Sequence, residues 1–153
     1  MLELLTAVLL IQTPSPPSCV TADLRVEEVI AAKARALQGT EYCQYRIYGT
    51  LSDVDGDGRE DFLVVFGIEG AEGYAGATIQ FLAVFPSGSQ WRPAVAEVGR
   101  RGQRIVERIG HGPGTAIRLQ TLEYGPSDAM CCPSRKTELH LAFRSGKITA
   151  IDE

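Results

Sequence analysis

The chain contains one segment with helical periodicity, close to its N-terminus. From Leu24 to about Gln38, apolar residues recur at intervals of three and four and therefore share one helical face. Asp23 precedes this segment as a helix N-cap and Gly39 follows it as a stop. The pattern predicts one amphipathic helix that packs on a sheet. Its predicted buried face is Val26, Val29, Ile30, Ala34 and Leu37.

From Thr40 onward, short apolar segments alternate with turn residues, which is typical of short strands. Phe62–Ile68 and Thr78–Phe85 are apolar nearly throughout, so we expect central strands covered on both faces, one of them by the helix. Thr137–Arg144 alternates apolar and polar residues, which favours a half-exposed strand. The other predicted strands are Tyr42–Leu51, Trp91–Val98, Gln103–Ile109, Thr115–Tyr124 and a short one at Lys147–Ile151.

These elements predict an α+β fold, in which one N-terminal helix packs on a predominantly antiparallel, meander-like β-sheet of about seven strands. The composition agrees, because 153 residues that are 44% hydrophobic suffice for one domain with a buried core. Sixteen glycines and eight prolines supply the many turns that a meander needs. No internal repeat or linker is visible, so residues 23–153 are expected to form a single β-rich domain.

The first 22 residues have the pattern of a secretory signal. An apolar run over Leu2–Ile11 is too short to span a bilayer and is followed by a polar, proline-rich stretch, although no Lys or Arg precedes it. Val20 and Ala22 have the spacing of a cleavage site after Ala22. We therefore expect a signal peptide over residues 1–22, export to the periplasm, cell envelope or exterior, and no transmembrane span in the mature chain.

Four cysteines indicate disulfide bonding if the protein is exported. Because adjacent cysteines seldom bridge each other, Cys43 is expected to pair with Cys131 or Cys132. Such a bridge would close a loop of about 89 residues and stabilise the fold by about 4.6 kcal/mol in the chain-entropy description. If Cys19 remains in the mature chain, it makes a second bridge available. The position of Cys19 also resembles that of a lipidated bacterial cysteine, although the preceding Pro-Pro-Ser departs from the usual pattern.

The most informative segment is the acidic run from Asp53 to Asp61. It holds five acids and one base and so accounts for the whole net charge of −4, which leaves no basic field to attract nucleic acid. Asp53, Asp55 and Asp57 alternate, a glycine follows, and Asp61 stands at the ninth position, as at the start of a calcium-binding loop. Val64 occupies the twelfth position and a predicted strand follows, which excludes an EF-hand.

The segment resembles the D-x-D-x-D-G-x-x-D loops of FG-GAP and VCBS-type repeats, which hold calcium between two strands. Carried over by position, the resemblance implies these ligands: Asp53, Asp55, Asp57, the Arg59 carbonyl and Asp61. Only one copy is present, so the resemblance covers the loop and the strand after it, and it does not imply a propeller. Taken with the later segment Asp128–Ser134, the loop also resembles uncharacterised exported bacterial proteins of the LppP/LprE lipoprotein type.

Two functions from different classes remain open. The first is an exported, non-catalytic, calcium-binding domain of the bacterial periplasm or cell envelope, disulfide-stabilised, with a binding or structural role toward an envelope or extracellular partner. The alternative is a small secreted hydrolase with a site in the turns around His111 and Asp128. No nucleophile motif accompanies His111, and a polar pocket that pairs His111 with a carboxylate would favour the enzyme.

Overall fold

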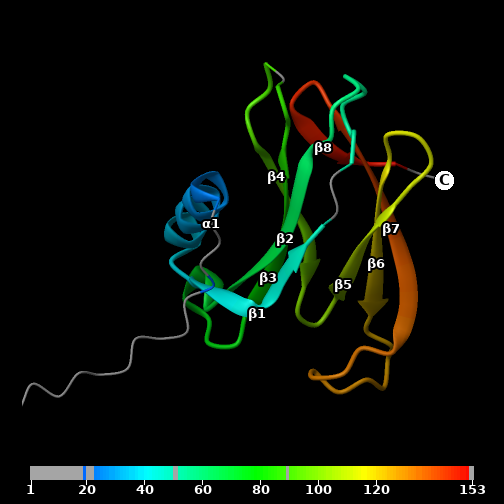
Figure 1. Ribbon diagram of the computed structural model, residues 1–153. Helices are drawn as coiled ribbons and strands as arrows, with labels where there is room; N and C mark the ends of the chain where they lie inside the picture. The colour runs from blue at the N-terminus through cyan, green and yellow to red at the C-terminus, as the bar shows by residue number, and fades with distance from the viewer. Residues whose placement is uncertain (1–18, 20–22, 50–51, 89, 152–153) are drawn as a thin grey trace, which may run out of the picture.

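The fold is one helix on a continuous antiparallel meander (Figure 1). The computed structural model describes Cys19 and residues 23–49, 52–88 and 90–151. Eight strands are hydrogen-bonded in the order of the sequence, β1 to β8. The elements are α1 (Leu24–Leu37), β1 (Thr40–Tyr48), β2 (Phe62–Glu69), the 3₁₀ turn η1 (Ala71–Gly73), β3 (Thr78–Phe85), β4 (Ala94–Arg100), β5 (Arg104–His111), β6 (Ile117–Glu123), β7 (Arg135–Arg144) and β8 (Lys147–Ala150).

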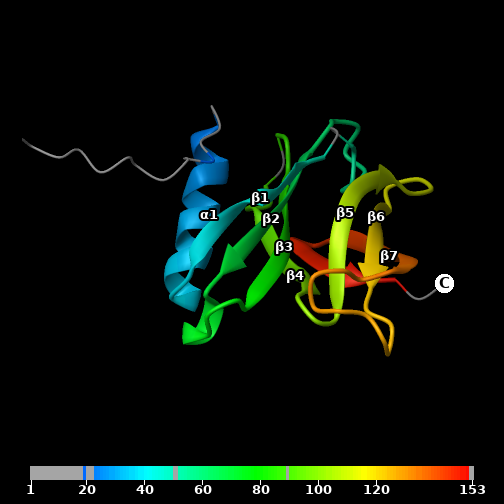
Figure 2. The same ribbon diagram turned by 90° about the horizontal axis from the view of Figure 1, so that it is seen from below.

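The meander folds over into two halves, so the molecule has three layers (Figure 2). Alternate residues of β2 and β3 serve two separate cores. Val64 and Phe66 face α1, where Val26 and Ile30 are buried, whereas Val65 faces the half formed by β5–β8. Central strands that are buried on both faces explain why their sequences are apolar throughout.

The α+β meander is therefore confirmed, and the predicted strand ends differ from the observed ones by at most three residues. Leu51 lies outside the described residues, as do residues 1–18 and 20–22 of the predicted signal. The N-cap is confirmed, because the Asp23 carboxylate accepts a hydrogen bond from the Arg25 amide. None of the helices in the described residues is long and apolar enough to cross a membrane.

The helix stop differs from the prediction. Gln38, not Gly39, takes the left-handed conformation, with φ 54° and ψ 33°, and its amide bonds back to the last turn of α1. Gly39 is required for another reason: a Cβ there would come within 2.6 Å of the Glu69 carbonyl and of the Ile68 side chain. The glycine therefore permits close approach of the chain to β2.

A buried glutamine joins the two halves of the sheet. The β4–β5 ladder contains a single residue pair, Arg100 with Arg104, so the backbone hydrogen bonds stop early. Gln80 on β3 is fully buried and reaches Val106 on β5, donating to its carbonyl at 3.1 Å and accepting from its amide at 2.6 Å. A Cβ on Gly99 of β4 would lie 2.8 Å from the Gln80 side chain. The glutamine thus replaces the missing backbone partners.

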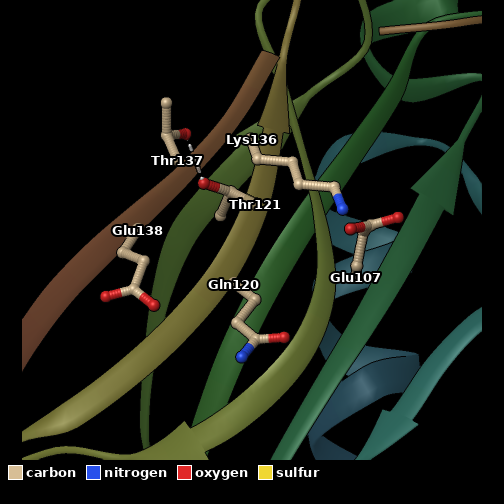
Figure 3. Close-up of a pocket in the computed structure, with 6 residues that line it drawn as sticks. All are labelled: Glu107, Gln120, Thr121, Lys136, Thr137 and Glu138. Carbon is tan, nitrogen blue, oxygen red and sulfur yellow. Dashed lines mark hydrogen bonds between the residues drawn. The ribbon is translucent and has the colours of Figure 1, made fainter. Parts of the chain in front are cut away.

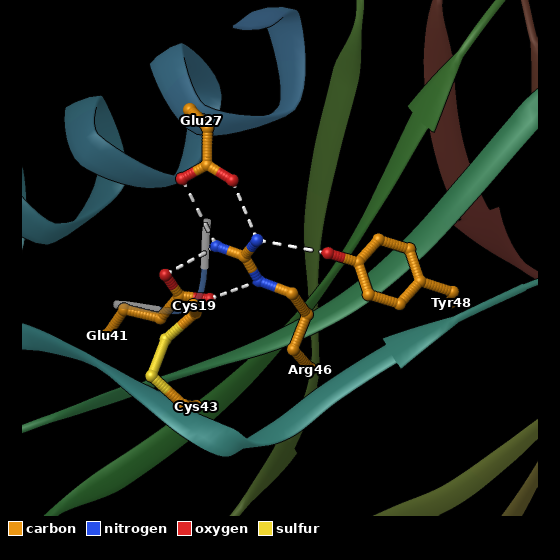
Figure 4. Close-up of a disulfide and its surroundings, with 6 residues drawn as sticks. All are labelled: Cys19, Glu27, Glu41, Cys43, Arg46 and Tyr48. Atoms are coloured by element: carbon orange, nitrogen blue, oxygen red, sulfur yellow. Dashed lines mark hydrogen bonds and ion pairs between the residues drawn. A yellow bond between two sulfur atoms is a disulfide. The ribbon is translucent and has the colours of Figure 1, made fainter. Parts of the chain in front are cut away.

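The disulfide prediction was wrong in its pairing. Cys43 bonds to Cys19, and Cys131 bonds to its neighbour Cys132. Cys43 lies on the α1 side of β1, beside Arg46 (Figure 4), whereas Cys131 lies in the β6–β7 connection and lines a pocket with Tyr42 and Tyr45. With Cys43 already bonded to Cys19, Cys131 and Cys132 are left to each other.

Candidate metal site

The loop between β1 and β2 gathers three carboxylates. Asp53, Asp55 and Asp61 each offer an oxygen, and these oxygens lie within 4.8 Å of one another. The isolated bridge between Ser52 and Asp61 closes the base of the loop, with backbone hydrogen bonds of 3.0 and 2.9 Å. The two ends of the loop are thereby held side by side, and Asp61 is brought back over Asp53.

Asp53 organises the turn through its own carboxylate. One oxygen accepts from the Gly56 amide at 2.7 Å and from the Asp57 amide at 3.1 Å, and the other accepts from the Gly58 amide at 3.0 Å. Gly56 and Gly58 adopt φ of 81° and 83°, which only glycine takes without strain. The positive φ at Gly58 agrees with the sharp turn that the sequence predicts at the sixth loop position.

Asp61 anchors the loop to the core. Its side chain is fully buried, and its two oxygens accept from the Val54 amide at 2.8 Å and from the Ser87 amide at 2.8 Å. Val54 itself is buried in the core that lies between the two halves of the sheet. Because Ser87 lies in the β3–β4 connection, Asp61 links two loops at the same end of the molecule. Each oxygen keeps a second lone pair available.

The electrostatics of the loop favour a cation. Burial raises the pKa of Asp55, and the charges of Asp61, Asp57 and Asp53 raise it further. A raised carboxyl pKa means that the negative charge is disfavoured where it stands. A divalent cation would reverse this, and the oxygen donors of this loop are those that calcium prefers.

Asp57, one of the predicted ligands, lies apart from the other three aspartates. Asp57 is exposed, and its carboxylate is outside the cluster and caps the Arg59 amide at 2.8 Å. The Arg59 guanidinium lies against Gly88, where an added Cβ would clash with it. The structure thus brings together the carboxylates of three of the four predicted aspartates. An open cavity of about 390 Å³ adjoins the loop, between Asp55, Asp57 and the single tryptophan, Trp91.

Comparison with protein-family models, curated proteins and solved structures finds no match to this chain. Ser87, Gln90 and Trp91 complete the surroundings of the loop and were missed by sequence reasoning. No local pattern marks them, because they come from the β3–β4 connection.

The two residues considered for a hydrolase do not share a site. His111 ends β5 and Asp128 lies in the β6–β7 connection, so β6 separates them by about 20 Å of strand. The Asp128 carboxylate accepts from the Gly125 amide, the Ser134 amide and the Ser134 hydroxyl. These hydrogen bonds lower the pKa of Asp128. Asp128 therefore shapes its own turn.

A second cavity, of about 360 Å³, lies over β5–β7 (Figure 3). Within it the Thr121 and Thr137 hydroxyls bond to each other at 2.7 Å, and the Lys136 ammonium points toward the Glu107 carboxylate. Gln120 and Glu138 complete the lining, which holds no histidine or cysteine. Within the part of the chain that the structure describes, the two threonine hydroxyls form the one hydrogen bond between side chains of this lining.

Proposed function

We propose that this protein is an exported, disulfide-stabilised, non-catalytic domain that binds calcium at Asp53, Asp55 and Asp61 and has a structural or binding role at the cell envelope. The observation that carries the proposal is the meeting of three carboxylates around a loop whose glycines and backbone hydrogen bonds support it. A metal-free loop gains nothing from this crowding of like charge.

The acidic sequence pattern supports calcium over other cations. Only oxygen donors meet in the cluster, with neither histidine nor cysteine, which suits a hard cation. The resemblance to FG-GAP and VCBS-type loops points to the same ion. Two disulfides are consistent with an oxidising compartment and so support export.

A bound cation would act through the residues that already hold the loop. Asp53 fixes the turn, and Asp61 connects the loop to Val54 in the core and to Ser87 in the neighbouring connection. Neutralising the three carboxylates would remove their repulsion and tighten both connections at this end of the molecule. We expect bound calcium to make the surface around Trp91 stiffer. This surface is where we expect a partner to bind.

Terbium luminescence tests the site directly, because Trp91 adjoins the loop and can transfer excitation energy to a bound lanthanide. We expect tryptophan-sensitised terbium emission that calcium displaces. Asp55→Asn should abolish it, whereas Glu60→Gln, an exposed carboxylate of the same loop outside the cluster, should leave it unchanged. Equal emission from both variants would overturn the proposal.

Thermal unfolding provides a second measurement. Extracellular calcium modules bind in the range of about 0.1–1 mM, so about 1 mM calcium should stabilise the wild type by roughly 0.4–1.4 kcal/mol relative to chelator. Asp55→Asn should lose this response and Glu60→Gln should keep it. Identical responses from wild type and Asp55→Asn would contradict calcium binding at this loop.

A further inference from the structure

A third cavity lies at the end of the molecule opposite the acidic loop. It measures about 230 Å³, and three tyrosines contribute to its wall. We call it the tyrosine pocket and define it by Tyr42, Tyr45, Glu69, Arg101, Tyr124 and Met130. These residues come from β1, the end of β2, the β4–β5 turn and the start of the β6–β7 connection. Four chain segments thus converge on one small cavity.

The aromatic wall is held in place by its own contacts. Tyr45 packs over Gly67, where an added Cβ would lie 2.9 Å from the tyrosine side chain. The rings of Tyr42 and Tyr45 meet at 83°, with centroids 4.9 Å apart. The Tyr42 hydroxyl donates to Gln44 at 2.6 Å, and the Tyr124 hydroxyl donates to the Met130 carbonyl at 2.9 Å. The hydroxyls of Tyr42 and Tyr124 are thus engaged within the fold, and the two residues line the pocket together with Tyr45.

Two opposite charges line the same pocket without pairing. Arg101 donates one N–H to the Gly76 carbonyl at 3.2 Å, and its other N–H groups remain available. Across residues 23–49, 52–88 and 90–151, no ion pair is formed by Arg101 or by Glu69. By contrast, the neighbouring Arg100 pairs with Glu97 at 3.0 Å. The pocket therefore presents separate positive and negative groups beside aromatic rings.

We propose that the tyrosine pocket binds a small zwitterion that carries an ammonium group and a carboxylate, as a betaine or a free amino acid does. Aromatic rings and a carboxylate recognise the ammonium, since a cation is attracted to ring faces and to Glu69. The Arg101 guanidinium recognises the carboxylate by charge-assisted hydrogen bonds. The volume of about 230 Å³ limits the ligand to a small molecule. The site does not depend on the calcium proposal.

Matched ligands test the charge pattern. Chemical-shift titrations of the full chain by NMR would use glycine betaine and glycine, which differ only in methylation of the ammonium. Two controls each remove one charge from betaine: 3,3-dimethylbutanoate keeps its shape without the cation, and choline lacks the carboxylate. We expect betaine or glycine to shift the amides around the pocket and both controls to bind at least tenfold more weakly. Failure of both zwitterions, or binding of either control as tight as that of the zwitterion, would overturn the proposal.

Adjacent arginines supply the matched variants. Arg101→Ala should weaken binding of the zwitterion by about tenfold or more, whereas Arg100→Ala should change it by less than about twofold. Glu69→Gln, which keeps the shape of the side chain, should weaken binding of the zwitterion and should not weaken binding of 3,3-dimethylbutanoate, because the variant removes a like charge from the site of that anion. Equal effects of the two arginine variants would contradict the assignment. Binding should be the same in calcium and in chelator, so a failure here is distinguishable from a failure at the acidic loop.

Discussion

The guanidinium of Arg46 on β1 donates to the carboxylate of Glu27 on α1 at 2.7 Å, within a partly buried cluster beside the Cys19–Cys43 disulfide (Figure 4). Arg46 also donates to Glu41 at 2.6 Å and to the Tyr48 hydroxyl at 3.0 Å. Burial by itself would lower the pKa of Arg46, but the hydrogen bonds to Glu41 and Glu27 outweigh it and raise the pKa. The arginine therefore stays charged and holds the helix on the sheet.

Arg46→Met should destabilise the fold by about 3–5 kcal/mol, because it leaves two carboxylates without their buried partner. The matched control is Arg25→Met, since the Arg25 side chain is 63% exposed and pairs with Asp23 at the surface. That variant should cost no more than about 1 kcal/mol. Urea unfolding measures both, and comparable losses would contradict a special role for the buried pair.

Gln80→Leu should cost about 2–4 kcal/mol, because it leaves the amide and the carbonyl of Val106 buried without partners. The same change at the exposed Gln103, in the β4–β5 turn, should be close to neutral. Hydrogen exchange adds a local measurement: the Val106 amide should exchange faster in Gln80→Leu. An unchanged exchange rate would show that Gln80 does not hold the two halves together.

The contacts of Arg46 and Gln80 are features that the sequence alone does not predict. The apolar runs over Phe62–Ile68 and Thr78–Phe85 predicted central strands because burial on both faces leaves a continuous local pattern. Gln80 interrupts the second run with one polar residue, and nothing nearby identifies Val106, 26 residues away, as its partner. Contacts between segments distant in the sequence carry no local periodicity.

The candidate metal site likewise has one part that the sequence predicts and another that it does not. The alternating aspartates and Gly58 are local, so the loop could be predicted, and Asp53, Asp55 and Asp61 do meet. The hydrogen bond from Ser87 and the position of Trp91 depend on the fold of the β3–β4 connection and could not be predicted. The disulfide pairing failed for a similar reason, because the side of β1 on which Cys43 lies depends on the sheet.

Asp55→Asn should change the free energy of unfolding in opposite directions with and without calcium. In chelator it should stabilise the protein by about 1 kcal/mol, because one of the crowded negative charges is removed. In about 10 mM calcium, which at these affinities stabilises the wild type by roughly 1.4–2.7 kcal/mol, the variant should be less stable than the wild type, because it has lost a ligand. Thermal unfolding in the two buffers measures the reversal, and a change of the same sign in both would contradict the proposed site.

Glu123 should contribute a pH-dependent part of the stability. Hydrogen bonds from Arg104, at 2.8 Å, and from Arg135 lower its pKa below the ordinary value of 4.5. The folded state thus favours the carboxylate, so this stabilisation is present above pH 4.5 and is lost as the pH falls through the lowered pKa. Glu123→Gln should cost about 1 kcal/mol or less at pH 7, and the difference from wild type should shrink in acid. A difference independent of pH would contradict this linkage.

The Cys19–Cys43 disulfide limits where a mature chain that keeps this bridge can begin. Cleavage after Ala22 would remove Cys19 and leave Cys43 with a free thiol, and a lipid on the Cys19 sulfur would equally exclude the bridge. If the bridge is retained, the mature chain must begin at or before Cys19. Mass spectrometry of the protein isolated from its native cells should then find Cys19 unlipidated and no free thiols. A chain that begins at Asp23 should expose one thiol and lose about 3.5 kcal/mol, the chain-entropy value for closing a loop of this length. Recovery of an exported chain that starts at Asp23 with unchanged stability would show that the bridge is dispensable.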